Sequence, residues 1–177
     1  MKILLAALGA AGMFVATSSI AGEGYIGAST GVMKFEDDSA GSGFSDTPFS
    51  AKVFGGYEFN ENFAVEVAYF STLQDAEDDV FGFPVDISLD GFTIRAVGSY
   101  PTSDNFSILG SVGFWDGDAE ASAFGTTATG GEDGITLGVG GKYRFESVSI
   151  RADFEWFDSD DTIWSLLVGV QVNFGGK

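Results

Sequence analysis

The chain has 177 residues, contains no Cys and no His, and carries a formal net charge of −18 at pH 7. It therefore forms no disulfide, has no thiol nucleophile or imidazole base, and binds no metal through thiolate or imidazole. The sign of the charge disfavours a nucleic-acid partner, and we expect no cofactor.

The first 21 residues predict a secretory signal peptide. A positive charge at Lys2 precedes an apolar run from Ile3 to Val15, and Ser19-Ile20-Ala21 places small residues before a cleavage site after Ala21. The apolar run is shorter than the roughly 20 residues that a membrane-spanning helix needs. We expect residues 1–21 to be removed on export and residues 22–177 to form one domain.

The remaining sequence alternates apolar and polar residues, which is typical of β-strands. Eight strands are expected, at 24–34, 50–59, 63–71, 91–100, 106–116, 134–145, 148–157 and 162–174. Short turns alternate with the connections at 35–49, 72–90, 117–133 and 158–161, of which the first three are long. This organisation predicts an antiparallel up-and-down barrel with both chain ends at the short-turn end, which faces the periplasm.

The segment Val148–Trp156 shows the alternation most clearly, because every second residue is apolar and Arg151, Asp153 and Glu155 lie between them. A soluble barrel of the lipocalin kind would turn the apolar face inward. Aromatic residues near the strand ends and Gly or Ser on the opposite face favour a transmembrane barrel instead. We therefore predict an all-β, eight-stranded transmembrane barrel with its apolar face toward lipid.

The strand charges predict a network inside the barrel. When the apolar residues alone set the phase of each strand, the charges in the body of the strands face inward. Five bases and four acids in a narrow lumen can pair, as buried charges require. We expect a plug of paired charges, and a narrow ion path is the alternative. The predicted lumen charge network is Lys52, Glu58, Glu66, Arg95, Lys142, Arg144, Arg151, Asp153 and Glu155.

The connections carry the negative charge. With Asp116 at a strand edge, they contain 18 acidic residues and neither Lys nor Arg. A solvated surface is one interpretation, and divalent cations that bridge carboxylates to lipopolysaccharide are another. Asp75-Ala76-Glu77-Asp78-Asp79 suggests a calcium site but lacks the EF-hand spacing.

Five segments carry recognisable motifs, namely 54–60 (F-G-G-Y-E-F-N), 63–70 (F-A-V-E-V-A-Y-F), 100–102 (Y-P-T), 151–156 (R-A-D-F-E-W) and 169–174 (G-V-Q-V-N-F). In this order they resemble strands and turns of the OmpA-like transmembrane barrel, a class that includes OmpX-like and opacity-type barrels. The resemblance implies an eight-stranded barrel in the bacterial outer membrane with interior charges, of which Glu66, Arg151 and Asp153 match. Val97 and Lys142 depart, because the family often has a lysine and an acid there. The chain ends at Lys177 without the family's periplasmic peptidoglycan-binding domain, so we expect no cell-wall anchoring.

These observations predict a non-enzymatic envelope protein that presents acidic extracellular loops. Alternatives are a low-conductance porin-like channel and an adhesion, ligand-binding or cation-binding surface module. Expected partners are outer-membrane lipid, lipopolysaccharide, the barrel-assembly machinery and possible divalent cations at the loops. Val170, Val172 and Phe174 alternate in the last strand and are the expected assembly signal, although Gly175-Gly176-Lys177 follow them.

Overall fold

The computed structural model describes residues 22–37, 44–73, 76–80, 83–123, 126–159 and 162–175. The expected signal peptide, residues 1–21, lies outside this part of the chain. No helix within the described residues is long and apolar enough to cross a membrane. The strands are β1 (Glu23–Asp37), β2 (Phe44–Asp46), β3 (Phe49–Asn60), β4 (Phe63–Thr72), β5 (Ala76–Val80), β6 (Phe83–Pro101), β7 (Phe106–Ala123), β8 (Thr126–Phe145), β9 (Val148–Asp158) and β10 (Thr162–Phe174).

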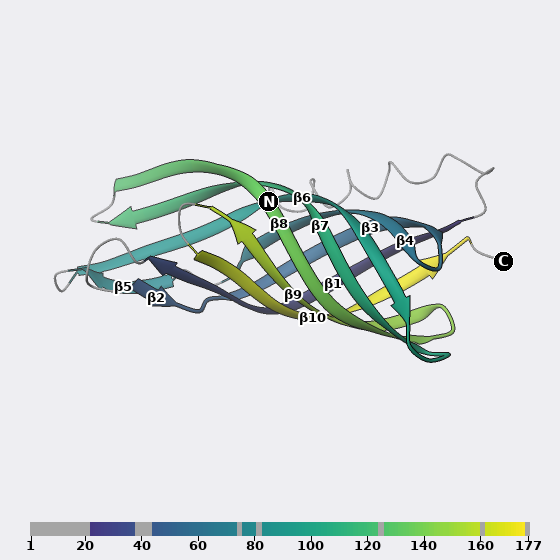
Figure 1. The fold of residues 1–177 in the computed structure, drawn as a ribbon. Coiled ribbons are helices and arrows are strands. Elements are labelled where there is room, and N and C mark those ends of the chain that lie inside the picture. The colour runs from purple at the N-terminus through teal and green to yellow at the C-terminus, as the bar shows by residue number, and fades with distance from the viewer. Residues whose placement is uncertain are drawn as a thin grey trace.

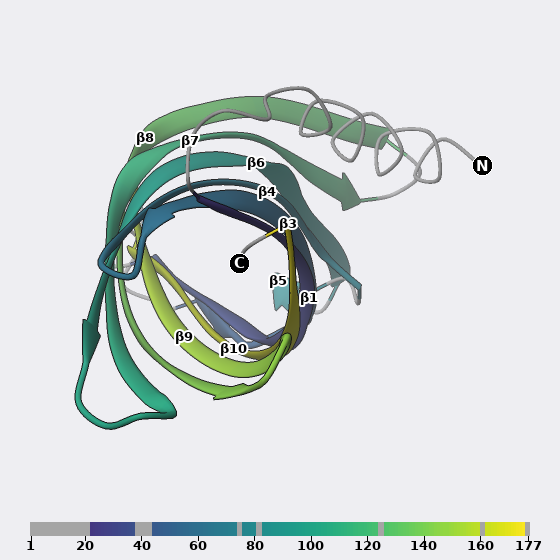
Figure 2. The same cartoon turned by 90° about the vertical axis from the view of Figure 1, so that its right-hand side faces the viewer.

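Eight of these strands form a closed antiparallel barrel, which confirms the predicted fold (Figures 1 and 2). The wall runs β1, β3, β4, β6, β7, β8, β9 and β10, and β10 pairs with β1 from Gly24↔Phe174 to Glu36↔Thr162. The closure leaves no free sheet edge along the paired part of the wall. Strands β2 and β5 are short additions that pair with β1 and β6.

The end of the barrel opposite the short turns is more ordered than the sequence predicts. Strands β6, β7 and β8 continue far past the expected boundaries, and the β7–β8 ladder runs to Ala123↔Thr126. The prediction of long loops at 72–90 and 117–133 is therefore wrong. These segments are rich in acids, and their alternation (Val85, Ile87 and Leu89 with Asp86, Ser88 and Asp90) places polar residues in the phase that is apolar in the membrane part of the wall. They therefore do not resemble lipid-facing strands, but an existing ladder extends through backbone hydrogen bonds that need no apolar outward face. Figure 1 shows the extensions at its left side.

The inner and outer faces of the wall differ in the exposure and polarity of their side chains, as the alternation predicts. Along β9, Arg151 is 3 % exposed and Phe154 is 41 % exposed, and the pattern repeats from strand to strand. A lipid-facing wall would show this arrangement, because a base at the middle of the lipid face costs about 2–4 kcal/mol. Exposed apolar side chains on the outward face include Ile26, Val53, Phe63, Ile94, Phe114, Leu137, Val139 and Val168.

The base nearest the outer end of β1 is not part of the lumen network. Lys34 follows the buried Met33 near the outer end of β1 and lies on the outward face, opposite Trp164. Its Nζ atom is 5.9 Å from the centroid of the Trp164 ring. A cation over an indole ring is favourable, and a lysine near a strand end can extend its ammonium group to the polar interface.

Candidate functional site: the filled lumen

Small residues on the inner face make room for aromatic rings in the lumen. A Cβ atom at Gly27 would collide with the ring of Phe54, and one at Gly56 would collide with the ring of Tyr25. The two rings therefore lie across the narrow interior and meet edge to face, with centroids 6.3 Å apart. Inward glycines on β1 and β3 thus allow side chains, rather than water, to fill the barrel.

Glu66 on β4 is the centre of a fully buried ion cluster. Its side chain is 0 % exposed and accepts hydrogen bonds from three neighbours. Tyr25 Oη donates to Glu66 Oε2 at 2.9 Å, and Arg151 Nη1 donates to the same oxygen at 2.7 Å. Arg95 donates to Glu66 Oε1 through Nε at 2.9 Å and also through Nη2. Both oxygens of this carboxylate are therefore held by cations from other strands.

The same cluster continues toward β9. Glu155 accepts from Lys52 Nζ and from Arg95 Nη1, and Asp153 accepts from Arg151 Nη2 at 3.1 Å. Three acids and three bases thus share one buried volume. Because the charges balance, none of the cations is left in the low-dielectric interior without a nearby anion.

A second cluster lies at the short-turn end of the lumen. Glu58 accepts from Lys142 Nζ at 2.6 Å and from Arg144 Nη2 at 2.9 Å. Arg144 Nη1 also reaches Glu23 Oε2 at 3.4 Å. This cluster is partly exposed and consists of two acids and two bases, so it too is neutral.

All nine residues of the predicted lumen network therefore lie in the lumen and take part in ion pairs. The structure adds Glu23, Tyr25, Gln171 and Asn173, which the sequence interpretation missed. Gln171 joins the two clusters, because it accepts from Arg151 Nη1 at 3.1 Å and donates to Glu58 Oε1 at 3.4 Å. The alternation itself predicts an inward position for Gln171 and Asn173, because they alternate with the outward Val170, Val172 and Phe174.

An apolar layer covers the ion clusters on the side away from the short turns. In β4 and β9, Phe70 and Phe157 lie nearer the outer strand ends than Glu66 and Glu155. The rings of Phe70 and Phe157 have centroids 5.4 Å apart, and that of Trp115 is 5.6 Å from Phe157. The expected plug of paired charges is therefore only one part of the lumen filling. The apolar layer comprises Met33, Phe70, Leu89, Trp115, Phe157 and Ile163, all at most 4 % exposed.

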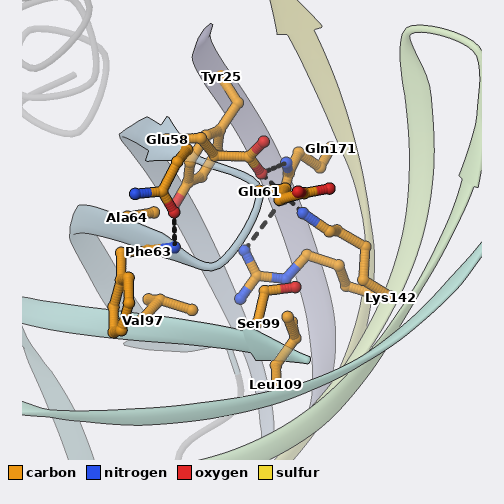
Figure 3. Close-up of a pocket in the computed structure, with 12 residues that line it drawn as sticks. Tyr25, Glu58, Glu61, Phe63, Ala64, Val97, Ser99, Leu109, Lys142 and Gln171 are labelled. Carbon is orange, nitrogen blue, oxygen red and sulfur yellow. Dashed lines mark hydrogen bonds and ion pairs between the residues drawn. The ribbon is translucent and has the colours of Figure 1, made fainter. Parts of the chain in front are cut away.

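Little space remains beside the clusters. The cavity drawn in Figure 3 lies between the short-turn end and the buried cluster, and its volume is about 10 Å³. Glu58, Lys142 and Gln171 point into it, with Val97 and Leu109 on the opposite side (Figure 3). This volume is about the least that can hold one water molecule, so the side chains that line this cavity leave little room for solvent.

Acidic side chains lie outside the lumen, beyond the apolar band of the wall. Asp118 pairs across the strands with Asp90, and Asp116 pairs with Asp133, so like charges stand directly opposite each other. Tyr69 Oη donates to Asp90 Oδ2 at 3.2 Å. Among the residues that the structure describes, no group of three or more acids is placed to hold a metal ion. The suggested calcium segment begins at Asp75, which lies outside the described residues, as do the side chains of the four residues after it.

The sequence matches the family model described as an outer membrane protein beta-barrel domain, over residues 3–174. The chain belongs to this family. The protein is thus an integral protein of the bacterial outer membrane, as expected. In barrels of this class the short turns face the periplasm. A comparison with curated proteins finds no match.

Solved structures support the same fold. The attachment invasion locus protein Ail of Yersinia pestis superposes with a TM-score of 0.66 at 20 % identity, covering 86 % of this chain and 99 % of that one. Neisserial surface protein A gives a TM-score of 0.70 at 18 % identity, with 85 % and 97 % covered. The N-terminal barrel of OprF from Pseudomonas aeruginosa gives 0.62 at 17 % identity, with 86 % and 97 % covered. At these identities the likeness concerns the fold alone.

Proposed function

We propose that this outer-membrane barrel is a sealed, non-enzymatic structural protein of the envelope, which presents an acidic surface outward. The observation that carries the proposal is the filling of the lumen by two neutral ion clusters beneath an apolar layer. An ion in transit would have to displace paired charges and then cross a layer of buried aromatic and aliphatic side chains. Both steps are costly, because a charge loses its hydration without gaining a partner.

The proposal predicts that the protein does not conduct. Purified protein, folded in detergent and inserted into a planar bilayer, is expected to give no reproducible conductance steps in 1 M KCl. Folding of each preparation is checked by a change of gel migration on heating, so that silence is not due to unfolded protein. Reproducible steps from the folded fraction would instead support the low-conductance channel.

The acidic outer surface argues against one kind of ligand that a structural neighbour binds. A structure of Ail contains the heparin analogue sucrose octasulfate, which is a polyanion. In this chain the predicted connections contain acids and no bases, so its outer surface repels such a ligand. We propose that the acids instead gather divalent cations at the lipopolysaccharide surface, because hard cations prefer carboxylate oxygens and screen the opposed aspartates.

We also propose that the end of β10 is the signal that the assembly machinery reads. Val170, Val172 and Phe174 lie outward on β10, and Phe174 is 45 % exposed beside Gly24 of β1. The Phe174→Ala variant is expected to insert several-fold more slowly in cells, measured as the heat-modifiable fraction after pulse labelling. Phe145→Ala is the matched control, because Phe145 is an outward aromatic residue at the same end of the barrel and 52 % exposed. Equal insertion of the two variants would leave Phe174 as an ordinary interfacial aromatic residue.

A further inference from the structure

Strand β8 has an open edge along its first ten residues. Its ladder with β7 is continuous from Phe106↔Tyr143 to Ala123↔Thr126, but its ladder with β9 begins only at Thr136↔Phe157. Within the described residues, no strand pairs with the other side of Thr126–Ile135. Figure 1 shows β8 reaching well past the arrowhead of β9, and Figure 2 shows this part flaring away from the barrel axis.

Over Thr126–Gly131 this edge lacks the usual protection against strand addition, whereas Glu132 and Asp133 place two charges at its base. Natural edge strands are commonly blocked by lysine, proline, a bulge or short length. The segment Thr126–Gly134 reads T-T-A-T-G-G-E-D-G, with neither lysine nor proline, and its register with β7 contains no bulge. Gly130 and Gly131 are exposed and bear no side chain that would hinder an approaching backbone. A row of backbone groups on this side is thus accessible to a partner.

A hollow with acidic walls lies at the base of the open edge, where β8 separates from β9. Its volume is about 380 Å³, and its lining residues are Gly131, Glu132, Asp133, Asp158 and Ser159. Asp133 comes from the edge itself, and Asp158 is the last residue of β9, the strand that would otherwise continue along β8. An added strand in the position of a longer β9 would therefore pass this hollow and meet its carboxylates.

We propose that the open edge of β8 binds an extended basic segment of a partner polypeptide, which adds to the sheet as an antiparallel strand. Backbone hydrogen bonds supply the affinity in this mode of recognition, and side-chain pockets supply the specificity. Here the three carboxylates of the hollow select lysine or arginine. A second copy of this chain fits less well, because it would bring another acidic edge against the first. The inference goes beyond the sealed barrel, and the conductance measurement does not bear on it.

The test measures binding of a fluorescent eight-residue peptide of alternating lysine and valine to the folded protein in detergent micelles. We expect binding, together with slower amide hydrogen exchange in Thr126–Gly134. A peptide of alternating glutamate and valine is expected to bind at least about tenfold more weakly, because it opposes the carboxylates. Equal binding of the two peptides would overturn the choice of a basic partner.

Two sets of variants separate strand addition from adsorption to a negative surface. Successive N–H groups of β8 point alternately to β7 and to the open edge, so one of Thr127→Pro and Ala128→Pro blocks the edge and keeps the β7 ladder. That variant, identified by unchanged amide hydrogen exchange in the facing residues Asp118–Ala123 of β7, should lose binding by roughly tenfold. Glu132→Gln with Asp133→Asn should weaken binding and its salt dependence. Undiminished binding to the edge-blocked variant, or a concentration-dependent dimer that the proline abolishes, would refute the proposal.

Discussion

Replacement of Glu66 by glutamine is expected to lower the free energy of unfolding by about 3–5 kcal/mol, the range for breaking a buried ion pair on one side only. Glutamine keeps the shape of the side chain but removes the charge that Arg95 and Arg151 share. Both guanidinium groups then remain buried, and the cluster carries one uncompensated positive charge. Urea titration of the protein in lipid vesicles, followed by tryptophan fluorescence, measures the change.

Two comparisons identify the cause. Glu61→Gln makes the same chemical change at an exposed turn five residues away and should alter stability by less than about 0.5 kcal/mol. The Glu66→Gln/Arg151→Gln double variant restores neutrality, so it should be more stable than the sum of the two single effects by about 0.5–3 kcal/mol. A Glu66→Gln variant as stable as Glu61→Gln would show that the buried cluster does not depend on this carboxylate.

Phe157→Ala is expected to destabilise the barrel by about 3–5 kcal/mol, because it removes a packed ring from the apolar layer and leaves a cavity. Phe157 contacts the rings of Phe70 and Trp115 and is 2 % exposed. Phe154 lies three residues earlier on the same strand but on the outward face, at 41 % exposure. Lipid chains can fill the space that its ring leaves, so Phe154→Ala should cost only the transfer term of about 1.5–3 kcal/mol.

The same urea titrations, carried out on both variants in one lipid, give the comparison directly. The difference between the two losses is the cavity contribution of the lumen. If Phe154→Ala were the more harmful change, the apolar layer would not be a packed interior, and the basis for a sealed lumen would fail.

The architecture could be predicted because one face of each wall strand is strictly selected. Lipid excludes charge from positions such as Val112 and Ile150, so alternation in the sequence reveals strands, their phase and the inward charges. Arg151, Asp153 and Glu155 were assigned to the lumen on this basis alone, and their side chains are buried there. The number of strands followed from counting these segments.

Features that do not depend on contact with lipid could not be predicted in this way. The outer halves of β6, β7 and β8 are outside the apolar band. Their alternation, such as Val85, Ile87 and Leu89 with Asp86, Ser88 and Asp90, has polar residues in the phase that is apolar in the membrane, so it does not identify them as parts of wall strands. The apolar layer was missed for a different reason. Phe70 and Phe157 have the same phase as Glu66 and Glu155, so alternation places them inward, but their grouping with Trp115 into one layer depends on the register between strands, which the sequence pattern does not give.

The ion pairs of the lumen join parts of the chain that are distant in sequence. Arg151 and Glu66 are 85 residues apart, Lys52 and Glu155 are 103 apart, and Arg144 and Glu23 are 121 apart. Such contacts form only after early and late strands have met. The chain therefore loses the conformational entropy of loop closure before these ion pairs can stabilise it. The network therefore contributes little to the speed of folding. We expect its stabilisation to appear after the transition state and to act by slowing unfolding, which would lengthen the lifetime of the folded barrel in the membrane.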